Sequence, residues 1–189
     1  LFLHLPLVIV VGVGMGMLWG GIVGFLKAKT GSHEVIVTIM MNYLAVYLLQ
    51  YLLQQPAFMA PGRNDPIGPV LEWSATLPRI AGTRLHMGFL LALIAVVVVW
   101  WLLERTALGL KIQAVGLNPN AAATAGMNVS RVTIITMAFA GGLCALAGVN
   151  SVTAPEYITS FPTQLSAGIV GTIGFDAITV ALLGRSRPL

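Results

Sequence analysis

The sequence predicts an all-α fold, a polytopic transmembrane helical bundle with about five membrane segments, one of them broken or re-entrant. Hydrophobic residues make up 57% of the 189 residues and charged residues only 8%, whereas about a quarter of the residues in soluble proteins are charged. The mean hydropathy is +0.90. Apolar runs at 35–53 and 87–103 approach the ~20 residues that cross ~30 Å of hydrocarbon as a helix. We therefore expect one transmembrane domain over residues 1–189.

The first helix is predicted over about residues 5–26 and is rich in glycine, with the stretch GVGMGMLWGGIVG at 12–24. A dinucleotide-binding glycine motif would need a preceding strand, whereas these flanks are apolar and helical. Small residues instead allow close packing of membrane helices. A signal peptide is disfavoured, because a basic n-region and an A-x-A site are missing. The chain begins with Leu1 and ends just after an apolar segment, so we expect it to be a fragment.

The second helix is predicted over 34–55, with Ser32 as a possible N-cap and Glu34 complementing the helix dipole. Asn42 and Tyr43 lie about two turns inside it. At that depth, polar groups need partners from a neighbouring helix or a wet cavity. Two interpretations stay open: these residues line a translocation path, or they hydrogen-bond to another helix.

A long loop follows at about 54–85, rich in proline and glycine, and is predicted to form ordered turns or a short hairpin. Helices are predicted at 86–104 and 131–150, and a glycine-broken apolar segment at 163–184. In that last segment, Asp176 either bonds freed backbone N–H groups, which we favour, or faces a polar pathway.

The polar insert at about 104–131 starts with Leu108, Ile112 and Val115 at i, i+4 and i+7. This spacing predicts that the preceding membrane helix continues along the interface. Gly116 is expected to interrupt that helix.

A short alanine-rich helix is then predicted over Pro119 to Ala125. Asn118 is a favoured N-cap, Pro119 suits the first helical position, and Gly126 suits a left-handed C-terminal residue. Such a helix carries no catalytic group, but its small side chains allow close docking to another protein. The insert is therefore interpreted as a docking surface for a partner protein.

The basic residues indicate the orientation. If successive helices alternate in direction, seven basic residues lie on one side of the membrane and three on the other. The positive-inside rule then places the 104–131 insert in the cytoplasm and the 54–85 loop outside. The first group is Lys27, Lys29, Arg105, Lys111, Arg131, Arg185 and Arg187, and the second is Arg63, Arg79 and Arg84.

No enzyme motif is present: the sequence has no P-loop, no H-E-x-x-H and no G-x-S-x-G. His4, His33 and His86 do not form a metal-ligand pattern. We expect no catalytic residues, no metal and no cofactor. Cys144 is the single cysteine, so no disulfide forms within the chain.

The insert RTALGLKIQAVGLNPNAAATAGMNVSR resembles the cytoplasmic coupling segment of ABC importer permeases of the branched-chain amino acid, ribose and nucleoside superfamily. In that family the segment carries the short helix that contacts the ATPase. The positions that match the pattern are Gly109, Lys111, Ala114, Val115, Gly116, Asn118, Pro119, Ala121, Ala122 and Gly126.

Two further stretches, GFLKAKTGSHEVIVTIMMNYLAVYLL at 24–49 and GFDAITVALLGRSRP at 174–188, resemble the nucleoside and simple-sugar branch. The resemblance implies a multi-pass permease subunit of the bacterial inner membrane that passes nucleosides or related sugars inward. It also implies a second permease subunit, separate ATPase subunits and an extracytoplasmic binding protein. The alternatives are a branched-chain amino acid or ribose permease of the same superfamily and, in another class, an ion-driven secondary transporter.

Overall fold

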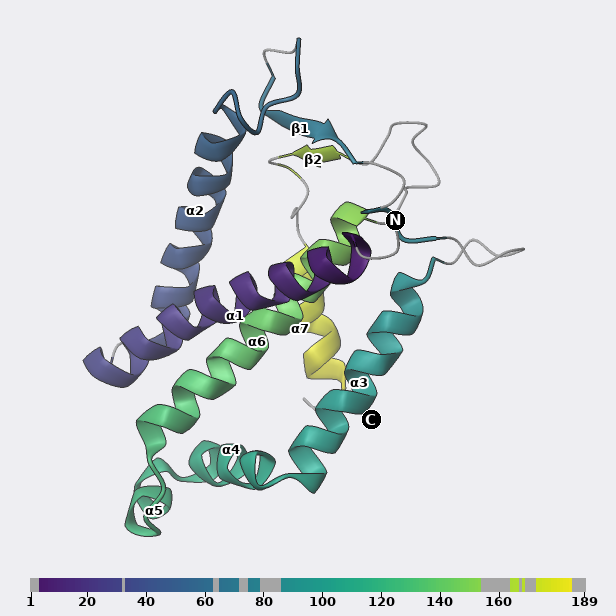
Figure 1. The fold of residues 1–189 in the computed structure, drawn as a ribbon. Coiled ribbons are helices and arrows are strands. Elements are labelled where there is room, and N and C mark those ends of the chain that lie inside the picture. The colour runs from purple at the N-terminus through teal and green to yellow at the C-terminus, as the bar shows by residue number, and fades with distance from the viewer. Residues whose placement is uncertain are drawn as a thin grey trace.

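The computed structural model describes residues 4–31, 33–62, 65–71, 75–78, 86–153, 164–166, 168 and 173–184. This part of the chain contains seven helices and two short strands (Figure 1). The elements are α1 (His4–Thr30), α2 (Glu34–Leu53), β1 (Ile67–Val70), α3 (Gly88–Arg105), α4 (Ala107–Leu117), α5 (Pro119–Thr124), α6 (Val129–Thr153), β2 (Gln164–Ser166) and α7 (Ile173–Leu183). Four of the helices, α1, α2, α3 and α6, are long and apolar enough to cross a membrane. The all-α polytopic prediction is confirmed.

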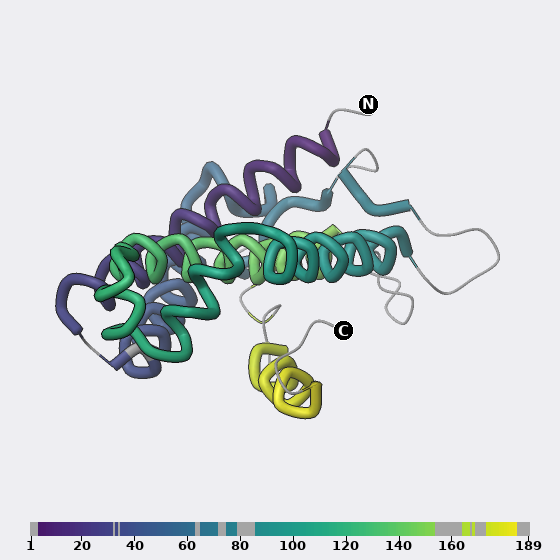
Figure 2. The backbone as a smooth tube through the Cα atoms, turned by 90° about the horizontal axis from the view of Figure 1, so that it is seen from below, coloured from purple at the N-terminus to yellow at the C-terminus, as the bar shows by residue number. Residues whose placement is uncertain are grey.

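The centre of the fold is the pair formed by α1 and α6, which lie against each other in Figures 1 and 2. Glycines at every fourth position of α1 face α6. A Cβ added to Gly20 would lie 3.0 Å from the Cα of Gly141 and would also overlap the Met137 carbonyl oxygen. A Cβ on Gly24 would lie 2.9 Å from the Cα of Ile134. The two backbones therefore touch, as small residues allow in membrane helices, and the predicted packing role of these glycines is confirmed.

Hydroxyl groups on α6 are satisfied within the helix itself. Thr133 donates to the Val129 carbonyl oxygen at 2.9 Å, and Thr136 donates to that of Val132 at 2.8 Å. Thr153, which is only 2% exposed, donates to the carbonyl oxygen of Val149 at 2.8 Å. Because each hydroxyl bonds one turn back, α6 needs no polar partner for these groups in the bilayer.

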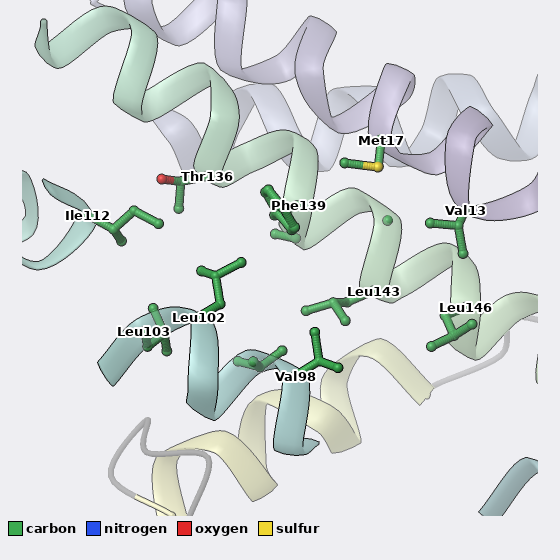
Figure 3. Close-up of a pocket in the computed structure, with 13 residues that line it drawn as sticks. Val13, Met17, Val98, Leu102, Leu103, Ile112, Thr136, Phe139, Leu143 and Leu146 are labelled. Carbon is green, nitrogen blue, oxygen red and sulfur yellow. The ribbon is translucent and has the colours of Figure 1, made fainter. Parts of the chain in front are cut away.

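A hollow of about 290 Å³ separates α3 from α1 and α6 (Figure 3). Figure 3 shows side chains such as Leu102, Phe139 and Leu143 pointing into it. Thr136 brings the only hydroxyl among the lining residues, and that hydroxyl is bonded to its own helix. The hollow is therefore suited to apolar atoms.

The 54–85 loop was predicted to form ordered turns or a short hairpin, and its described part has turns over 54–62 but no hairpin. β1 pairs antiparallel with β2, far along the chain, with Ile67 opposite Ser166 and Val70 opposite Gln164. The same loop is tied to neighbouring elements by two backbone bonds, from Leu77 N to the Thr153 oxygen (2.9 Å) and from Met87 N to the Pro78 oxygen (3.1 Å). Local turn residues carry no information about so distant a partner.

Several predicted boundaries shift. α1 runs to Thr30, because it ends only at Gly31, whose φ of +64° is readily adopted by glycine. His33, not Ser32, is the N-cap of α2, with no side-chain capping bond, and Ser32 lies outside the described residues. In the 163–184 segment the structure has β2 and the eleven-residue α7.

Candidate functional site

A sharp corner between α3 and α4 starts the predicted coupling insert. Thr106 has extended φ and ψ of −117° and 154°. Its hydroxyl donates to the Leu102 carbonyl oxygen at 2.6 Å and accepts from the Gly109 N–H at 3.1 Å. One side chain thus closes the end of α3 and caps the start of α4. The predicted continuation of the membrane helix is wrong, because the chain turns at this residue.

The corner is tightened by two further residues. Gln113 donates from Nε2 to the Leu103 carbonyl oxygen at 3.1 Å, so α4 supplies a partner for a carbonyl at the end of α3. A Cβ on Gly109 would overlap the carbonyl oxygens of Leu102 and Leu103. Gly116, which was expected to interrupt the helix, lies within α4. The sequence interpretation missed Thr106, although a threonine before an apolar helix is a recognisable N-cap signal.

The short helix α5 forms as predicted. The Asn118 Oδ1 accepts from the N–H groups of Asn120 at 3.0 Å and Ala121 at 3.1 Å. Pro119 occupies the first turn, and Gly126 follows the helix with φ +82°. The helix ends at Thr124, with Ala125 as its C-cap. Local capping chemistry is therefore enough to specify this element.

The matched positions of the insert divide by exposure. Lys111, Gly116, Asn118, Pro119, Ala121 and Gly126 are exposed; Ala114 and Val115 are half-buried; Gly109 and Ala122 are buried. Ala122 is only 4% exposed, so its methyl group anchors α5 and Ala121 offers the outward surface. Sequence reasoning also missed Leu117, which is 87% exposed at the end of α4. Its i, i+7 spacing from the exposed Leu110 was the available signal.

An open hollow of about 600 Å³ lies beneath this insert, lined by Lys27 of α1, Ile112 and Val115 of α4, Pro119 of α5, and the first turns of α6. Ile112 and Val115 thus lie on the inward face of α4, as their spacing predicts. The hollow also places Lys27 at the end of the molecule that carries α4 and α5. Arg63, Arg79, Arg84, Arg185 and Arg187 lie outside the described residues.

The predicted path residues lie on two separate helices. Asn42 and Tyr43 are exposed on α2, and Tyr43 is 61% exposed. Asp176 lies in the first turn of α7, where a carboxylate complements the helix dipole. Figures 1 and 2 both show α7 apart from α2. The described part of the chain therefore does not gather these residues into one site.

Four long apolar helices are the feature of a multi-pass membrane protein. Among the described residues, no group of three or more His, Cys, Asp or Glu side chains could hold a metal ion. The chain belongs to the family described as the branched-chain amino acid transport system permease component, which matches residues 1–189.

Several curated relatives match nearly the whole chain. A guanosine ABC transporter permease protein of Bacillus subtilis is 36% identical over 97% of this chain and 52% of its own length. A nucleoside ABC transporter permease protein of Lactococcus lactis is 34% identical over 99% of this chain and 52% of its own. A glucose ABC transporter permease protein of Haloferax volcanii is 31% identical over 96% and 49%. The chain thus spans about half the length of these relatives, and it has no significant match among solved structures.

Proposed function

We propose that this chain is part of the permease subunit of an ABC-type importer that passes nucleosides or related simple sugars inward. Residues 1–189 would form a single transmembrane permease domain. The rigid α3–α4–α5 corner carries the proposal, because it ends in an exposed, capped helix without catalytic groups. The names of the guanosine, nucleoside and glucose permeases support the substrate class.

Energy would come from separate cytoplasmic ATPase subunits that dock on α5. Thr106 and Gln113 hydrogen-bond to carbonyl oxygens at the end of α3 and so hold α4 against it. A displacement of α5 would therefore be transmitted through α4 to the membrane-spanning helix α3. Closure of the ATPase would bias the helices between two access states. The coupling residues are Gly109, Lys111, Ala114, Val115, Gly116, Asn118, Pro119, Ala121, Ala122 and Gly126.

The other proposed partners are a second permease subunit and an extracytoplasmic substrate-binding protein in the inner (plasma) membrane of the cell. The end that carries α5 would face the cytoplasm, since Lys27, Lys29, Arg105, Lys111 and Arg131 belong to the predicted cytoplasmic group. Asn42, Tyr43 and Asp176 are the proposed contributors to the translocation path. A permease for a branched-chain amino acid is the second candidate, favoured by the description of the family.

The test is uptake of radiolabelled guanosine, with ribose and leucine as competitors, by the full-length importer in proteoliposomes with and without ATP and the ATPase. We expect ATP-dependent guanosine uptake that guanosine analogues compete for and leucine does not. Ala121→Glu should abolish it, because a charged side chain would stand on the outward face of α5. Ala107→Glu, also exposed but at the start of α4, is the matched control.

Leucine uptake in place of guanosine uptake would select the amino acid permease. Guanosine uptake that persists without the ATPase would instead indicate an ion-driven secondary transporter. Normal transport by the Ala121→Glu variant would overturn the role of α5.

A further inference from the structure

Tyrosine is concentrated on one face of one helix in this protein. Three of the four tyrosines, Tyr43, Tyr47 and Tyr51, lie on α2. Their spacing of four residues places them one above another on the same side of the helix. They are 61%, 66% and 61% exposed. We call these three residues the tyrosine ladder.

The tyrosine ladder reaches the middle of the membrane, where lipid offers no hydrogen-bond partner for its hydroxyl groups. α2 has 20 residues, or about 30 Å at 1.5 Å per residue. Tyr43 lies at its middle, Tyr47 one turn further along, and Tyr51 in the last turn. A tyrosine in the last turn fits the interfacial aromatic belt, but a phenol at mid-bilayer needs a hydrogen-bond partner.

The ladder cannot satisfy its own hydroxyls as α6 does. Threonine hydroxyls on α6 reach back to carbonyl oxygens of the preceding turn, whereas a phenol oxygen stands at the far end of a rigid ring. No hydrogen bond joins Tyr43, Tyr47 or Tyr51 to another of the residues that the structure describes. Their partners must come from outside the described residues.

We propose that the tyrosine ladder lines the outer half of the translocation path, with Tyr43 at the midplane and Tyr51 at the external mouth. A wet path supplies partners at three successive depths, whereas a covering helix would need a matching polar group at each turn. The apolar hollow of Figure 3 offers no alternative route for a polar solute, because its single hydroxyl is already bonded.

The side chains of the tyrosine ladder also indicate which class of solute would pass. This second inference rests on the proposed function and makes its substrate class more specific. Beyond Glu34, α2 has no ionisable side chain other than the three phenols. Asp176, the only charged side chain assigned to the path, could balance the ammonium group of a zwitterionic amino acid but not its carboxylate, which would enter the hydrocarbon region without a counter-charge, at a high cost. Tyrosine rings instead stack on flat neutral rings and their hydroxyls bond ring edges. The ladder therefore fits a nucleoside better than leucine.

Single-cysteine labelling of the full-length importer in proteoliposomes tests this assignment. Cys144 is exposed, so the background carries Cys144→Ala together with replacement of any other cysteine of the importer. Tyr43→Cys and Tyr47→Cys are treated from outside with a charged, membrane-impermeant thiol reagent. Val97→Cys is the matched control, because Val97 is 58% exposed near the middle of α3 and its neighbours one turn away, Leu93 and Trp101, carry no hydroxyl group.

We expect both ladder variants to be labelled about tenfold faster than the control, because hydrocarbon excludes a charged reagent. Guanosine, supplied with its binding protein, should slow the labelling, and leucine should not. Labelling as slow as the control, in vesicles that take up guanosine with ATP, would overturn the ladder and leave the proposed function standing. Absence of ATP-dependent guanosine uptake by the unaltered importer would overturn the proposed function instead.

Discussion

The α1–α6 pair and α2 are both apolar enough to span a membrane, yet they use their surfaces in opposite ways. The pair brings glycine against glycine, with Gly20 and Gly141 at backbone contact, and bonds its hydroxyls inward. Among its described residues, α2 buries only Leu53, which is 2% exposed, and it presents three large, exposed tyrosines. Within the described residues, the hydroxyls of Thr133 and Thr136 on α6 are hydrogen-bonded, whereas the three phenols of α2 have no hydrogen-bond partner.

This difference separates two roles. Close backbone packing has few alternative arrangements, so we assign α1 and α6 a structural role. We call this pair the frame; α4 and α5 pack against its helix α6. A face of unpartnered phenols is suited to a changing, hydrated surface.

The largest effect is expected from Gly20→Leu. The new side chain would collide with backbone atoms of Met137 and Gly141, and backbone cannot move aside as a flexible side chain does. We expect a loss of about 3 kcal/mol or more of folding free energy, seen as loss of monodisperse importer in detergent. Gly14→Leu is the control, because nothing lies within 4 Å of its added Cβ. Equal yields of the two variants would contradict the close packing.

The second effect compares two hydroxyl deletions. Tyr43→Phe removes a group that we assign to the path, and we expect guanosine uptake to fall about tenfold. Thr136→Val removes a hydroxyl that bonds only its own helix at 2.8 Å, so uptake should change by less than about twofold. Initial rates per reconstituted importer decide the comparison. A larger loss for Thr136→Val would reverse the roles given to α6 and α2.

The third effect concerns α5, which the frame carries at one end. Asn118→Ala removes the acceptor of the Asn120 and Ala121 N–H groups, at a cost of about 1 kcal/mol to the helix. ATP-driven uptake should fall severalfold while the overall melting temperature barely moves. Asn118→Asp keeps a capping oxygen and should retain uptake. If both variants transport equally poorly, the cap is not the reason.

The smallest effect has the opposite sign. Gly148 lies in α6, and nothing is found within 4 Å of a Cβ added there. Gly148→Ala should therefore stabilise the importer by about 0.5–1 kcal/mol through helix propensity. Thermal unfolding followed by tryptophan fluorescence measures it. A lower melting temperature would mean that this side of α6 is as tightly covered as the side that faces α1.

The helices and α5 could be predicted because their causes are local. Apolar run length sets a membrane span, and Asn118, Pro119 and Gly126 act on neighbouring residues in the chain. The residues of the candidate coupling surface were instead taken from the resemblance to the permease family, and their role stays a prediction. The inward turn of Ala122 and the corner at Thr106 were missed, since which side of a two-turn helix packs down depends on the elements beneath it.

By itself, the sequence determined that the chain is a membrane protein, where its four long helices lie, and that a short capped helix, α5, forms between α3 and α6. Only the tertiary structure decided that β1 pairs with β2, that the α1 glycines meet Gly141, and that the tyrosines of α2 face away from the described helices. Hydropathy and capping act over a few residues, whereas strand pairing and helix contacts join segments far apart in the chain, and many such pairings are compatible with one local pattern.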